Sequence, residues 1–143
     1  MTISSSNRKA GPFTGTGSLD TYSFTFKVFA ASDLLVVRTD LSSVQTNLVL
    51  TTDYTVSLNA NQDSNPGGSV TLVAGNLASG YLLTITSSIS ALQAVDFTNQ
   101  GGFYPNVLNT ALDKLTILMQ QAYEQLSRAF IVDISSSKTP DEF

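Results

Sequence analysis

The chain has 143 residues, with 7 basic and 11 acidic side chains and a net charge of −4. It contains no cysteine and no histidine, which excludes a Ser-His-Asp mechanism, a thiolate nucleophile and zinc or iron–sulfur sites held by cysteine. An acidic chain with few basic residues binds nucleic acid poorly, and the apolar runs are too short to cross a membrane. We therefore expect one domain with no metal ion, cofactor, nucleic-acid or membrane partner.

The first 18 residues lack the periodicity of a strand or a helix. Their three glycines do not make a phosphate-binding loop, because no strand precedes them and no helix follows. We expect a mobile arm over 1–18. Arg8 and Lys9 give this arm a positive charge on an otherwise acidic chain, which suits an acidic groove on a partner.

Residues 19–104 contain six segments typical of β-strands, separated by turn-forming residues. The clearest is Thr21 to Val28, where aromatic or apolar residues alternate with polar ones. The loop at 59–68 is interpreted as a hairpin and not a calcium site, because it holds one carboxylate and lacks the terminal Glu. These features predict an antiparallel β-sandwich or partly open barrel. The other predicted strands are 34–39, 47–50, 54–58, 69–72 and 81–89.

Few residues of the β part are candidates for chemistry. Asp96 has no partner carboxylate, histidine or metal ligand close in sequence, so we interpret it as an acceptor for backbone N–H groups or as a cap before the helix. Arg38 stands alone in a nearly buried strand, either as an edge charge or as the partner of one of the acids. We therefore expect no catalytic residues.

Residues 105–131 contain no glycine and predict one helix about 40 Å long, with Pro105 in its first turn. Two apolar seams run along it and share Leu115, so the apolar face is wider than one neighbour covers. One seam can pack on the β domain, and the other then needs another chain, which predicts a trimeric bundle. Residues 132–143 read as a polar linker. The seam residues expected at the trimer interface are Leu108, Leu112, Leu115, Leu118, Met119, Ala122, Leu126 and Ala129.

Six short motifs follow one another between residues 11 and 131. They are 22–26 with 34–37, 52–56, 68–72, 83–85, 95–103 and 112–129. In this order they resemble the N-terminal tail-attachment domains of tail-fibre proteins from short-tailed bacteriophages. The most specific is the motif before the helix, which contains Asp96, Phe97, Gly101, Gly102 and Phe103.

The resemblance implies a structural virion protein, made in the cytoplasm of the bacterial host and placed in the phage tail. It implies a homotrimer, either a fibre's N-terminal anchor or a separate adaptor, that docks on the adaptor and nozzle proteins of the tail. A receptor-binding fibre or spike would then be a further partner. Attachment would involve the N-terminal residues Arg8, Lys9 and Phe13.

Two other classes fit the sequence less well. A carbohydrate-binding β-sandwich needs an exposed aromatic platform and usually a tryptophan, and the chain has no tryptophan. A hydrolase without histidine or cysteine would depend on a pair of carboxylates, and residues 1–104 contain no glutamate. A structural anchor or adaptor therefore remains the preferred hypothesis.

Overall fold

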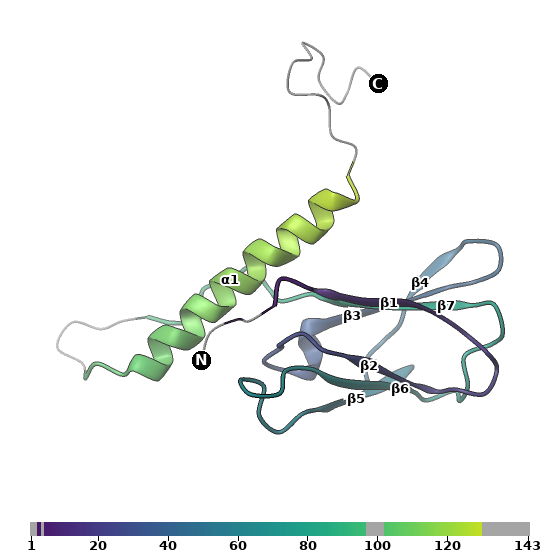
Figure 1. Ribbon diagram of the computed structural model, residues 1–143, viewed down its shortest axis with the longest axis horizontal. Coiled ribbons are helices and arrows are strands. Elements are labelled where there is room, and N and C mark those ends of the chain that lie inside the picture. The colour runs from purple at the N-terminus through teal and green to yellow at the C-terminus, as the bar shows by residue number, and fades with distance from the viewer. Residues whose placement is uncertain (1–2, 4, 97–101, 130–143) are drawn as a thin grey trace, which may run out of the picture.

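In a computed structural model of the chain, residues 3, 5–96 and 102–129 are described, and they form seven strands, a short 3-10 turn (Ala31–Asp33) and one helix. Figure 1 shows two layers of strands with the helix at one end. The elements are β1 (Lys9–Thr14), β2 (Thr21–Phe24), β3 (Leu34–Thr39), β4 (Gln45–Asn47), β5 (Tyr54–Leu58), β6 (Gly68–Leu72), β7 (Leu82–Ser87) and α1 (Pro105–Ser127).

The strands form two antiparallel sheets with the orders β1-β7-β3-β4 and β2-β6-β5. Side chains from both sheets meet between the layers in one apolar core. This arrangement confirms the predicted mainly β fold of two antiparallel sheets followed by one helix. The buried core residues are Tyr22, Phe24, Phe26, Val28, Leu34, Val36, Tyr54, Val70, Leu72, Leu77, Leu83 and Ile85.

The bounds of β3 and β5 agree with the prediction, whereas β2 ends four residues early. Its partner β6 begins at Gly68, because Gly67 has a φ of 101° and turns the chain away. A Cβ on Gly67 would lie 2.1 Å from the carbonyl oxygen of Phe24, so only glycine allows this close approach. Phe26 and Val28 remain buried beyond the end of β2, so the alternation correctly predicted burial but not strand pairing.

The strand predicted at 47–50 lies instead at Gln45–Asn47. Asp40 causes the shift, because its side chain accepts the N–H groups of Ser42 and Val44 and closes a tight turn directly after β3. The pairing therefore starts at once, with Gln45 opposite Thr39.

The prediction of an arm without secondary structure over 1–18 is wrong for its second half. Residues Lys9–Thr14 form β1, which pairs with β7 through a register shift between Ala10 and Phe13. Glycine and proline conceal this strand in the sequence, because Gly11 has a φ of 93° at the irregularity. The β domain therefore begins before residue 19.

Helix α1 begins at Pro105, as predicted, and ends at Ser127, earlier than the predicted 131. The N–H groups of Arg128 and Ala129 bond to carbonyl oxygens three residues back, at Gln125 and Leu126, which closes the last turn. Residues 130–131 and the predicted linker lie outside the described part. Within that part, no helix has the length and apolar character needed to span a membrane.

Candidate functional site

The side of α1 that contacts the β domain is formed by Asp113, Ile117 and Gln121, which follow one another at intervals of four residues on one stripe. Ile117 is fully buried, and Asp113 is buried beside it. This stripe belongs to neither of the two predicted apolar seams. The actual contact stripe has one apolar residue between two polar ones, so hydrophobic periodicity did not reveal it.

The two polar residues of the stripe have specific partners in the β domain. The Lys27 ammonium lies 2.7 Å from a carboxylate oxygen of Asp113 and 2.5 Å from one of Asp63, in the β5–β6 loop. The Gln121 carboxamide oxygen accepts the Ser87 hydroxyl at 3.1 Å and the Ile89 N–H at 3.0 Å. These contacts fix the direction in which α1 leaves the sandwich.

Charge pairing changes the titration of two of these groups. Burial alone would lower the pKa of the Lys27 ammonium, but its hydrogen bonds to Asp113 and Asp63 outweigh burial and raise the pKa above its usual value. The hydrogen bond from Lys27 lowers the pKa of the Asp63 carboxyl. Both shifts favour the charged forms of Lys27 and Asp63.

Most of the predicted interface residues lie on the opposite side of α1 and are exposed. Leu112 is 52% exposed, Leu115 59%, Met119 58% and Leu126 53%. Ala122 and Ala129 are exposed as well. A contiguous row of half-exposed large apolar side chains on one helix face is typical of a surface that contacts another chain.

One edge of this row borders a groove of about 390 Å³ between α1 and residues 91–95. Four predicted interface residues line the groove: Leu108 and Leu118 are partly covered, and Leu112 and Leu115 remain exposed. The Lys114 ammonium bonds to the carbonyl oxygen of Leu92 and holds this segment on the helix.

The predicted attachment residues do not lie on a free arm. Arg8 is 2% exposed, and its guanidinium donates to the carbonyl oxygen of Lys27 at 2.8 Å and lies 5.4 Å from the centre of the Phe26 ring. Burial lowers the pKa of Arg8 to about 10. Phe13 packs on the core with its ring centre 5.2 Å from that of Tyr22. The side chain of Lys9 is partly exposed, and its ammonium forms no hydrogen bond or ion pair among the described residues.

The motif before the helix is described only in part. Asp96 is exposed, and within 5–96 and 102–129 no group donates a hydrogen bond to its carboxylate. Phe103 is 77% exposed and Gly102 is exposed beside it. Phe97 and Gly101 lie outside the described residues. The predicted capping role of Asp96 thus has no support in the described part.

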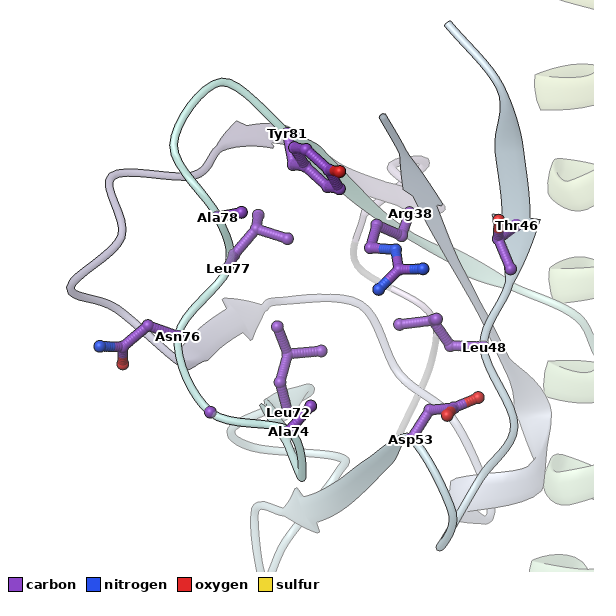
Figure 2. Close-up of a pocket in the computed structure, with 11 residues that line it drawn as sticks. Arg38, Thr46, Leu48, Asp53, Leu72, Ala74, Asn76, Leu77, Ala78 and Tyr81 are labelled. Carbon is purple, nitrogen blue, oxygen red and sulfur yellow. The ribbon is translucent and has the colours of Figure 1, made fainter. Parts of the chain in front are cut away.

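Arg38 lies at the other end of the sandwich. The sequence did not decide whether its role is that of an edge charge or of an ion-pair partner. Figure 2 shows its side chain in a pocket with Tyr81 on one side and Leu48 and Asp53 on the other. The guanidinium carbon is 5.9 Å from the centre of the Tyr81 ring. None of the described carboxylates lies within 4.0 Å of it, although Asp53 lines the same pocket.

A compact β-sandwich that holds a long helix with an uncovered apolar face has the features of a module for protein assembly. No family model matches the chain. The chain is similar to the tail spike protein of Salmonella phage epsilon15, with 39% identity over 117 residues that make up 82% of this chain. This similarity relates the chain to a phage tail protein, a component of the virion tail. The aligned part is 11% of the relative's length, so the relative's own activity does not transfer directly.

Proposed function

We propose that the chain is an attachment module of a phage tail fibre or spike, either an N-terminal anchor or an adaptor, that works as a homotrimer. The observation that carries the proposal is the uncovered apolar face of α1, formed by Leu112, Leu115, Met119 and Leu126. The similarity to a phage tail spike protein supports a place in the virion tail. Two further copies of the chain would cover this face in a three-helix bundle.

The amount of exposed apolar surface supports association through α1. Complete burial of a Leu or Met side chain contributes about 1.5–3 kcal/mol, so covering the exposed half contributes about 1 kcal/mol for each residue. Four such residues give about 4 kcal/mol per chain and about 12 kcal/mol per trimer, as an upper bound before the entropic cost of association. A trimer that is stable at micromolar concentration needs about 16 kcal/mol over its two association steps, so the sandwich domains would have to add contacts of their own.

The two ends of the sandwich support a division of roles. Gln121 of α1 contacts Ser87, the last residue of β7, and the Arg38 pocket lies near Tyr81, just before β7 begins. The six residues of β7 separate the two ends by about 20 Å. In the proposed arrangement, the pocket end faces the adaptor and nozzle proteins of the tail. The helices lead toward the host-recognition apparatus.

We propose a structural role for the module and not a catalytic one. Among the described residues no cluster of three or more metal-ligating side chains occurs. Asp96, the carboxylate considered first, is exposed and forms no ion pair among the described residues. Asp63 and Asp113 are both bound to Lys27 in a structural cluster. General acid–base chemistry needs paired groups in a cleft, and these carboxylates do not provide it.

Two measurements test the proposal. Sedimentation equilibrium of the full chain at micromolar concentration should give three times the chain mass of 15.2 kDa. The purified protein, added to tails from virions that lack it, should bind them and restore infectivity. A monomer in the first experiment contradicts the trimer, and a trimer that does not bind tails contradicts the attachment role.

A further inference from the structure

A cleft of about 220 Å³, shown in Figure 2, opens near Tyr81 at the start of β7, whereas α1 contacts Ser87 at the end of this strand. Its walls come from the end of β3, the segment around Asp53 before β5, and the loop that joins β6 to β7. The walls are mainly apolar, with Leu48 and Leu72 at the bottom. Arg38 and Asp53 are its charged side chains.

Arg38 points into the sandwich instead of out of it. Along β3, Leu34 and Val36 face the core, and the two-residue period of a strand places Arg38 on the same inner face. The guanidinium is flanked by the Tyr81 ring. In the described part of the chain, no acceptor bonds to it, so its five N–H donors remain available.

Asp53 lines the same cleft, but its carboxylate forms no ion pair with Arg38 within 4.0 Å and is bonded elsewhere. One of its carboxylate oxygens accepts the Val49 N–H at 2.8 Å, and its carbonyl oxygen accepts the Val73 N–H at 2.9 Å. Asp53 thus joins the two segments that form one side of the cleft. This leaves the inward cation of Arg38 without a counter-ion within 4.0 Å among the described residues.

Two exposed valines adjoin one side of the cleft. Val49 is 58% exposed and Val73 is 56% exposed, and both are bonded through their N–H groups to Asp53, which lines the cleft. An inward charge near a sheet edge can simply prevent unwanted strand pairing. That role does not require exposed valines near the charge. Exposed apolar residues beside a charged cleft are instead typical of a protein interface.

We propose that the cleft binds an acidic side chain, Asp or Glu, of a neighbouring tail protein, whose carboxylate pairs with the Arg38 guanidinium. Apolar residues beside that carboxylate cover Val49 and Val73. A protein that covers the cleft removes Arg38 from water, and a buried cation without a counter-ion is strongly unfavourable. A volume of about 220 Å³ holds one side chain, and most small-molecule sites are larger. This inference rests on the proposed attachment role.

The test measures binding of purified protein to tails that lack it. Arg38→Gln should leave the melting temperature and the sedimentation mass unchanged, and it should weaken tail binding by about 30-fold or more, as expected for a lost charge pair at an interface. Arg38→Lys should recover only part of the binding, because lysine lacks the planar fork that matches a carboxylate. Arg128→Gln, which removes one positive charge at the far end of α1, should bind as the wild type does.

The Asp53→Asn variant distinguishes two possible partners of Arg38, a carboxylate of the neighbouring protein and the Asp53 carboxylate of the chain itself. The carboxamide oxygen of asparagine can still accept the Val49 N–H, so the turn should persist. Tail binding should be unchanged or stronger, because a like charge near the incoming carboxylate is removed. Binding as weak as that of Arg38→Gln would instead make Asp53 the counter-ion and overturn the inference.

Two further outcomes would also overturn the proposal that the cleft binds an acidic side chain. Arg38→Gln protein that binds tails with wild-type affinity refutes the cleft as a docking site and leaves the attachment role intact. Arg38→Gln particles that assemble normally but adsorb poorly to host cells would assign the cleft to a cell-surface glycan. Failure of the wild-type protein to bind tails, by contrast, refutes the attachment role itself.

Discussion

Replacement of Leu115 by aspartate tests the uncovered helix face most directly. Leu115 is 59% exposed in a single chain, so the substitution removes less than half of a leucine's burial and costs the monomer about 1 kcal/mol. In a bundle, the same side chain would place three carboxylates on an apolar seam. The penalty is several kcal/mol for each ion, so the three together are comparable to the upper bound of about 12 kcal/mol available from covering the seam.

The assay combines sedimentation equilibrium with thermal melting followed by circular dichroism. Leu115→Asp should sediment as a monomer at micromolar concentration and retain the β signal of the sandwich. Thr116→Asp is the matched control, since Thr116 is exposed on a neighbouring face of α1, and it should remain trimeric. Leu115→Asp protein that forms trimers like the wild type would refute the assignment of this face.

Three further predictions concern the rest of the molecule. Ile117→Ala should lower the free energy of unfolding by about 2–5 kcal/mol in urea titrations, because Ile117 is fully buried between α1 and the sandwich. Lys27→Met should destabilise the protein by about 3 kcal/mol at pH 7, since it leaves the Asp113 carboxylate buried and unpaired. Folding raises the pKa of Lys27 above 10.5, so the contribution of its charge to stability is complete below pH 10.5 and is lost as the pH rises through the raised pKa. The difference in free energy of unfolding between the wild type and Lys27→Met should therefore shrink in that pH range. Asp96→Asn should leave tail binding unchanged. Neither this variant nor the wild type should turn over polysaccharide, peptidoglycan or ester substrates, and an activity that is present in the wild type and lost in Asp96→Asn would contradict a non-catalytic role.

The β core could be predicted well from the sequence because its residues alternate. Tyr22, Phe24, Leu83 and Ile85 follow the two-residue period, and all are buried as expected. The first strand could not be found in this way. Its pairing with β7 depends on a residue far away in sequence, since Lys9 lies opposite Thr86, and local propensity carries no information about such a partner.

The contacts of α1 could also be predicted only in part from local sequence patterns. Hydrophobic periodicity identified the exposed face of α1, including Leu112 and Leu115, but it did not reveal the inner face. The inner face is held by one isoleucine and by polar contacts to Lys27 and Ser87. The signal that could have helped is Lys27 itself, a cation within the most aromatic strand segment of the chain, because a partly buried cation needs a carboxylate partner.

The position of β7 has a mechanical consequence. This strand lies between β1 and β3 and is hydrogen-bonded to both, and the chain leads from its end toward α1. A pull along the helix, with the opposite end of the sandwich held, loads these two ladders in shear, so that many hydrogen bonds resist together and none is opened singly. In a single-molecule force experiment, the sandwich should therefore withstand higher forces when pulled through α1 than when pulled through β4, an edge strand of three residues that can peel away from β3 one bond at a time.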